Sequence, residues 1–121
     1  MNTLETIRSI LAEILDLDPT DITADTYVIR DLEAESIDLL EIGVAIQHRL
    51  GTQVDDDTLF LKNLRIQLAR AEQNQTAPLD LLTETYPHLD AARLRQILDD
   101  VQAGPVLRVR DLVAYVDAAH S

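Results

Sequence analysis

The residues best suited to chemistry form the tetrapeptide Glu35-Ser36-Ile37-Asp38, in which a serine hydroxyl lies between two acids. A serine in this setting can be a nucleophile, a helix cap or an attachment point for another group. A nucleophile is disfavoured, because no Gly-x-Ser-x-Gly turn surrounds Ser36 and His48 lies about three helical turns further along the chain. A plain helix cap, worth roughly 1 kcal/mol and common in proteins, stays open beside the role of attachment point.

The serine opens a predicted helix that runs to about Leu50, with Gly51 as its stop signal. A core stripe at helical spacing consists of Leu39, Ile42, Ile46 and Leu50. A second apolar row consists of Ile37, Leu40 and Val44, next to Asp38 and Glu41. The helix therefore has more apolar surface than contact with one core requires.

Gly43 lies in the middle of this helix, where it costs about 0.5–1 kcal/mol relative to alanine. Two explanations fit: a close crossing with another helix, or space left free beside the apolar stripe for a bound group. The sequence does not separate them.

A long loop from Asp18 to Glu35 is predicted before this helix, because the stretch contains Pro19 and no sustained period. Loops of that length in a compact domain are usually functional or disordered. Its apolar anchors are Ile22, Val28, Ile29 and Leu32. A first helix over about residues 3–16 precedes the loop, with Asn2 and Glu5 forming its cap.

The acidic run Asp55-Asp56-Asp57 predicts another helix start, since carboxylates favour the positive end of the helix dipole. It lacks the alternating ligands, the turn glycine and the distant glutamate of a calcium loop. We expect the helix to continue through Leu61, Leu64, Leu68 and Ala71. Three further helices are expected: one around residues 79–82, one from residue 90 to about 101, and a last one with Val109, Leu112, Val113 and Val116 on its apolar face.

The composition favours a single all-α domain. Its 121 residues are 46% hydrophobic but only 3% aromatic, and they include three glycines and four prolines. There is no cysteine, which excludes disulfides and thiolate metal sites and fits a reducing compartment. We see neither a secretory signal nor an apolar run long enough to span a bilayer, and expect a soluble, cytoplasmic monomer without a metal.

The net charge of −12 disfavours nucleic acid and anionic lipid as partners and favours basic protein surfaces. The acids are concentrated at the front of the chain: residues 1–60 contain 14 acids and three bases, whereas residues 61–121 contain eight and seven. The front half therefore carries the acidic surface.

The stretch from Asp31 to Ile42 resembles the prosthetic-group site of acyl carrier proteins, usually written Asp-Ser-Leu with acids following at helical spacing. Glu35 stands in place of the usual aspartate, and Glu33 stands where the family commonly has glycine. The resemblance covers residues 1–59 and 105–119, where residues 106–116 look like the family's closing helix. It implies an acyl-carrier-protein-like helical bundle, enlarged by a helical insertion over about residues 60–104.

The resemblance implies a carrier, not an enzyme. A phosphopantetheinyl transferase would attach 4′-phosphopantetheine from coenzyme A to Ser36, and the arm would carry acyl groups as thioesters between separate enzymes of lipid, fatty acid or polyketide-type biosynthesis. A phosphodiester on Ser36 would lie at a helix start, where the dipole favours an anion. Acyl-loading and acyl-processing enzymes with basic surfaces would dock on Glu35, Ile37, Asp38, Leu40, Glu41 and Val44.

Two other functions stay open at this point. The chain could be an unmodified acidic helical adaptor that binds a protein partner, or a peptidyl carrier for aminoacyl groups. In the carrier interpretation, the space beside Gly43 is where an acyl chain would lie. The acyl cargo, the pathway and the role of residues 60–104 do not follow from the sequence.

Overall fold

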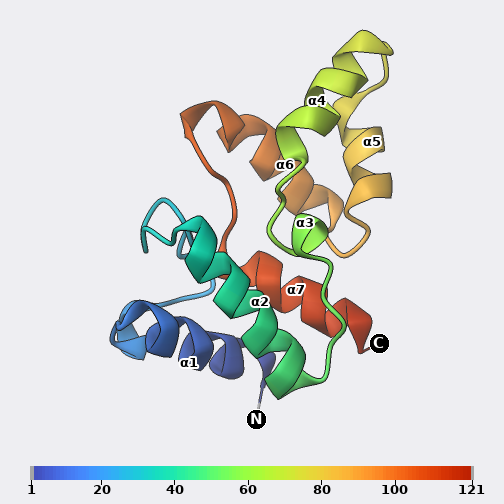
Figure 1. The fold of residues 1–121 in the computed structure, drawn as a ribbon. Coiled ribbons are helices and arrows are strands. Elements are labelled where there is room, and N and C mark those ends of the chain that lie inside the picture. The colour runs from blue at the N-terminus through green and yellow to red at the C-terminus, as the bar shows by residue number, and fades with distance from the viewer. Residues whose placement is uncertain (1, 121) are drawn as a thin grey trace.

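The computed structural model describes residues 2–120, and these residues form seven α-helices and two short 3-10 helices (Figure 1). The α-helices are α1 (Thr3–Leu15), α2 (Ser36–Leu50), α3 (Asp56–Leu59), α4 (Leu64–Gln73), α5 (Pro78–Thr85), α6 (Ala91–Asp100) and α7 (Val109–Ala119). The 3-10 helices are η1 (Pro19–Asp21) and η2 (Val101–Ala103). Over residues 2–120 there is no β-strand, only an isolated bridge between Tyr27 and Arg108, which confirms the all-α prediction.

Helix α1 packs against both α2 and α7. It begins as predicted, with the Asn2 side chain accepting a hydrogen bond from the backbone N–H of Glu5 at 2.8 Å. The apolar side chains that these three helices bury most completely are Ile7, Ile10, Leu11, Ile42, Ile46, Val109, Leu112 and Val116. They form a Leu/Ile/Val core with no aromatic residue among them, as the composition indicates.

Helices α4, α5 and α6 form a second group, in which α5 contacts both of the others. Figure 1 shows α4 and α5 at the opposite end of the molecule from α1, with α3 lying between this group and α7. The buried residues of both groups belong to one continuous apolar cluster. None of the helices within residues 2–120 is long and apolar enough to cross a membrane.

The helix expected to run from the acidic run to Ala71 is interrupted, which corrects the prediction. Helix α3 ends at Leu59, and Leu61 has a positive φ of 56°, after which α4 begins at Leu64. Leu59, Phe60 and Leu61 are all buried. A backbone in the left-handed region cannot continue a right-handed helix, so the chain turns at Leu61.

The long loop before α2 is held by backbone hydrogen bonds to the segment that leads into α7. The N–H of Val28 donates to the carbonyl of Leu107 at 3.0 Å, and the N–H of Val109 donates to the carbonyl of Thr26 at 2.9 Å. Ile22 and Val28 are fully buried, as predicted for anchors of the loop. The loop is therefore part of the packed fold, because its polar backbone has partners in the protein.

Candidate functional site

Ser36 is the first residue of α2 and is exposed to solvent. The capping position is Glu35, whose backbone N–H donates to the Asp38 carboxylate at 2.8 Å. The Ser36 hydroxyl has no hydrogen-bond partner among residues 2–120. The interpretation of Ser36 as a plain helix cap is therefore wrong, since its two neighbours in the motif cap the helix without it.

The backbone around Ser36 favours a negatively charged group on the hydroxyl. The N–H groups of Ser36 and Ile37 have no acceptor among the described residues, as is usual in the first turn of a helix. Helix α2 is 15 residues long and begins at Ser36, so its dipole places partial positive charge there. A phosphodiester attached here would be stabilised by both effects.

The backbone conformation of Glu33 explains why the family that this site resembles commonly has glycine at the same position. Its φ is 58°, in the left-handed region, and it lies in the turn that leads the chain into α2. The turn is closed by the N–H of Ala34, which donates to the carbonyl of Val28 at 3.3 Å. A residue other than glycine costs about 1 kcal/mol in this conformation, so the position suits glycine and is occupied here at some cost in stability.

The predicted docking residues lie around Ser36 on the exposed side of α2. Ile37, Leu40 and Val44 are 63%, 53% and 70% exposed, which is unusual for side chains of this size and kind. Glu35 and Glu41 are exposed, and Asp38 is half-buried. The acids and the apolar row thus form one mixed surface beside Ser36, consisting of Glu35, Ile37, Asp38, Leu40, Glu41 and Val44.

This mixed surface continues into a shallow groove of about 460 Å³ between α1 and α2. Leu40 and Val44 contribute to it from α2, and Ile14 contributes from α1. An ion pair between Glu13 and Arg49 links the two helices beside the groove. Apolar area that stays open on a small domain is typical of an interaction surface.

The structure favours a close helix crossing at Gly43. A β-carbon on Gly43 would lie 2.9 Å from Asp56 Oδ1 and 3.6 Å from Phe60 Cε2. The space beside this glycine is therefore occupied by α3 and the residue that follows it. The missing side chain allows α2 and α3 to approach each other, which offsets the cost of a glycine within a helix.

A separate apolar cavity of about 220 Å³ lies beside the end of α2 that carries Ser36. Leu39 lines it from α2, and most of its remaining wall comes from residues 60–65 and 101–107. Lys62 and Arg65 contribute the charged part of the lining and are both exposed. This cavity was not predictable from the sequence, because its walls come from segments that meet only through the turn at Leu61.

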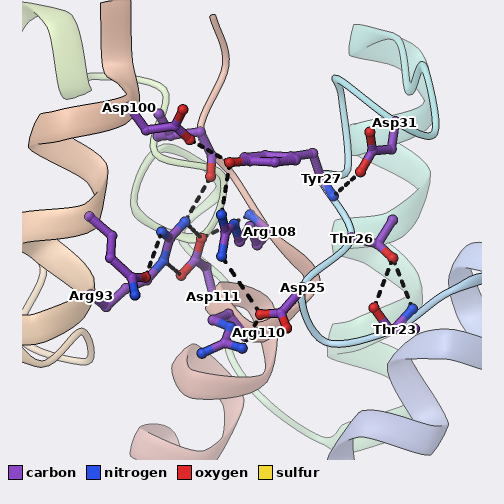
Figure 2. Close-up of polar contacts among 12 residues, drawn as sticks. Thr23, Asp25, Thr26, Tyr27, Asp31, Arg93, Asp100, Arg108, Arg110 and Asp111 are labelled. Atoms are coloured by element: carbon purple, nitrogen blue, oxygen red, sulfur yellow. Dashed lines mark hydrogen bonds and ion pairs between the residues drawn. The ribbon is translucent and has the colours of Figure 1, made fainter. Parts of the chain in front are cut away.

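A cluster of polar side chains joins the loop before α2 to α6 (Figure 2). The Tyr27 hydroxyl donates to Asp100 at 2.6 Å and accepts from Arg108 at 2.8 Å, and the Arg30 guanidinium lies 4.1 Å from the centre of the tyrosine ring. Arg30 also pairs with Asp100 at 3.1 Å. The hydrogen bond from Tyr27, followed by that from Arg30, lowers the pKa of Asp100 below its ordinary value.

A buried ion pair joins α6 to α7. Arg93 Nε lies 2.7 Å from Asp111 Oδ1 and Arg93 Nη2 lies 2.8 Å from Oδ2, and both residues are buried (Figure 2). Arg93 also donates to the carbonyl of Val106, and Asp111 accepts from the backbone N–H of Arg108, each at 2.8 Å. Neither this pair nor the tyrosine cluster contacts Ser36, and their effect is to fix the loop, α6 and α7 relative to one another.

Comparisons with known proteins identify the family of the chain. The family model of the phosphopantetheine attachment site matches residues 5–67, just over half of the chain. The acyl carrier protein of Helicobacter hepaticus is 25% identical over 76 residues, which cover 62% of this chain and all of that protein. The acyl carrier protein of Helicobacter pylori is 30% identical over 57 residues, which cover 47% of this chain and 73% of that protein. No solved structure gives a significant match.

A small helical bundle that the model of the phosphopantetheine attachment site matches is a phosphopantetheine carrier domain. The chain belongs to the acyl carrier protein family. Members of this family carry covalently attached 4′-phosphopantetheine and are not enzymes, and they interact with phosphopantetheinyl transferases and biosynthetic enzymes. The family match ends within α4, so it includes α1 and α2 but not α7, the other helix that packs on α1.

Proposed function

We propose that Ser36 is the residue that receives 4′-phosphopantetheine, and that the chain carries acyl groups on this arm as thioesters between separate enzymes. The observation that carries the proposal is the state of the Ser36 side chain. Its hydroxyl is exposed, takes no part in capping α2, and lies next to two unpaired backbone N–H groups. A role in stability does not account for a serine in that position, whereas attachment of a phosphodiester does.

We also propose that partner enzymes dock on the mixed surface beside Ser36, defined above by its six residues. Its acids attract basic side chains over about one Debye length, and Ile37, Leu40 and Val44 supply apolar contact at the centre. Such a combination favours fast, salt-dependent association with modest affinity. A carrier needs those properties, because it must leave each enzyme after every step.

For the cargo and the place of work, we propose acyl intermediates of lipid, fatty acid or polyketide-type biosynthesis in the cytoplasm. The name shared by the curated relatives supports an acyl rather than an aminoacyl group. The acidity of residues 1–60 points in the same direction, since it suits basic partner enzymes.

The architecture we propose has a carrier core of residues 1–59 and 105–119, with residues 60–104 as a helical insertion. The packing of α1 against α2 and α7 supports it, as does the separate grouping of α4, α5 and α6. A chain in which a Gly/Ser linker replaces residues 62–104 tests it, and Asp111→Asn is added because the deletion removes Arg93, the buried partner of Asp111. A folded, modifiable core supports the proposal, and an unfolded chain assigns the segment to the core.

Transfer of phosphopantetheine from coenzyme A by a broad-specificity transferase tests the main proposal. The wild type should gain the mass of one phosphopantetheinyl group, and Ser36→Ala should gain none while keeping the same helical circular dichroism. Ser9→Ala is the matched control, because Ser9 is also exposed and helical. If the wild type stays unmodified with several transferases, the chain is an acidic adaptor and the proposal is wrong.

Charge reversal tests the docking surface. Glu41→Lys is the informative variant, because the Glu41 side chain is exposed and makes no hydrogen bond to the described residues, whereas Asp38 is needed to cap α2. The control Glu72→Lys makes the same change of net charge on α4. We expect Glu41→Lys to slow modification severalfold at low salt, with less effect at high salt, and Glu72→Lys to have little effect. Equal rates for the two variants would refute this docking surface.

A further inference from the structure

The apolar cavity of about 220 Å³ begins within one helical turn of the proposed attachment residue. Leu39, which lines it, lies three residues after Ser36 on the same side of α2, and side chains at that spacing are about 5–6 Å apart. Most of the lining is apolar, from Ile29, Phe60, Leu61, Leu64, Val101 and Val106. A flexible arm on Ser36 therefore starts beside this cavity.

Two cations lie at the edge of the cavity without carboxylate partners. Lys62 and Arg65 are exposed and form no ion pair with the described residues. Five other basic side chains are paired with carboxylates: Arg30, Arg49, Arg93, Arg108 and Arg110. Arg8, Arg70 and Arg95 form no ion pair with the described residues either, but they do not line the cavity, so Lys62 and Arg65 are the cations free to meet a group at its rim.

The size and the lining of the cavity limit what it can hold. An apolar cavity of about 150 Å³ takes up benzene, so this one has room for a short chain rather than a long one. A charged group inside it would lose its water without compensation. At the rim, the same group would keep its hydration and meet Lys62 and Arg65.

We propose that the cavity receives a short acyl group carried on Ser36, and that Lys62 and Arg65 select an acyl group ending in a carboxylate. The apolar middle of such an ω-carboxyacyl group lies in the cavity, and its carboxylate lies at the rim beside the two cations. The inference rests on the proposed attachment at Ser36 and adds the chemical class of the cargo.

A comparison of two loaded forms tests this selection. A promiscuous transferase loads the chain from glutaryl-coenzyme A or from pentanoyl-coenzyme A, two acyl groups of equal length that differ in their terminal charge. Intact mass confirms loading, and the rate of thioester cleavage by hydroxylamine, divided by the rate for the same coenzyme A thioester, reports how far the cargo is sheltered. Two exposed ion pairs change such an equilibrium by about threefold to tenfold. We expect the glutaryl form to be protected more than the pentanoyl form by about this factor, and the difference to shrink with salt.

Variants separate the rim cations from general electrostatics. Lys62→Gln with Arg65→Gln should abolish the preference for the glutaryl form, whereas Arg70→Gln with Arg95→Gln removes the same charge elsewhere and should leave it intact. Equal protection of the two acyl groups in the wild type, or the same loss of preference in both double variants, would overturn the inference. A chain that cannot be loaded at all refutes the proposed function instead, which intact mass shows before any hydroxylamine is added.

Discussion

The buried ion pair between α6 and α7 offers the sharpest test of how the two groups of helices are held together. Arg93→Met keeps the apolar stem of the side chain and removes its charge, leaving Asp111 buried with only the backbone N–H of Arg108 as a donor. Removing one partner of a buried pair costs about 3–5 kcal/mol, because the other charge stays in the interior uncompensated. The carbonyl of Val106 also loses its donor.

A loss of this size is about a fifth or more of the stability of a typical domain of about 5–15 kcal/mol. Urea unfolding followed by far-ultraviolet circular dichroism measures it, and with an m-value of about 1–3 kcal/mol per M the midpoint should fall by at least about 1 M. Arg95→Met is the matched control on the same helix, since Arg95 is exposed and unpaired, and it should change stability by less than about 0.5 kcal/mol.

The double variant Arg93→Met with Asp111→Leu distinguishes the charge effect from lost packing. It removes both charges, so it should be more stable than Arg93→Met alone, although the unpaired Val106 carbonyl and Arg108 N–H still cost about 1–3 kcal/mol each. If Arg93→Met destabilises the chain no more than Arg95→Met does, the pair is not the link between α6 and α7 that the geometry indicates.

Three further predictions concern single positions. Gly43→Ala should destabilise the chain despite the higher helix propensity of alanine, and urea unfolding should show the loss shrinking in an Asp56→Ala background, because the new β-carbon meets Asp56. Gln75→Gly should stabilise the chain by about 0.5–1 kcal/mol in the same assay, since Gln75 is exposed with a φ of 54°. Burial holds the pKa of His88 below its ordinary 6.5, although Asp111 acts in the opposite direction. The unfolded chain therefore binds more protons at this residue than the folded chain does. The contribution of His88 to stability is complete above pH 6.5 and declines as the pH falls towards the folded-state pKa. His88→Gln should remove that part of the slope in a series of unfolding curves against pH.

Local signals predicted most of the secondary structure, because they act within one turn of the chain. Asn2 caps α1 and Gly51 ends α2 in the left-handed conformation, as their positions in the sequence indicate. The exposed row on α2 followed from periodicity alone, since one helix cannot bury both of its apolar faces on a single core.

Features that depend on contacts between distant segments were missed. Leucines at 61, 64 and 68 keep helical spacing and predict a continuous helix, whereas the left-handed backbone at Leu61 separates α3 from α4. The sequence around Arg93 does not indicate that this residue is buried, because its partner Asp111 lies on another helix, α7. The cavity near Ser36 is lined by residues around the turn at Leu61 and by residues 101–107, which no local pattern brings together.

At the site itself, the motif located the candidate serine, but it did not show whether that serine caps the helix. The sequence favoured an attachment point at Ser36 but left a plain cap open, since both occur at helix starts. The structure separates them, because the capping groups are Glu35 and Asp38. At Glu33 the sequence shows a departure from the family pattern, and the positive φ in the structure gives the physical reason why glycine suits that position.

Tandem mass spectrometry of the peptide that contains Ser36 tests the central proposal most directly. The protein is isolated from cells that co-express a phosphopantetheinyl transferase, digested and fragmented, so that the modified residue is located and not only counted. The account predicts one phosphopantetheinyl group, located on Ser36 and absent from Ser9. An unmodified Ser36 in protein from transferase-rich cells, or the group on any other residue, would contradict it.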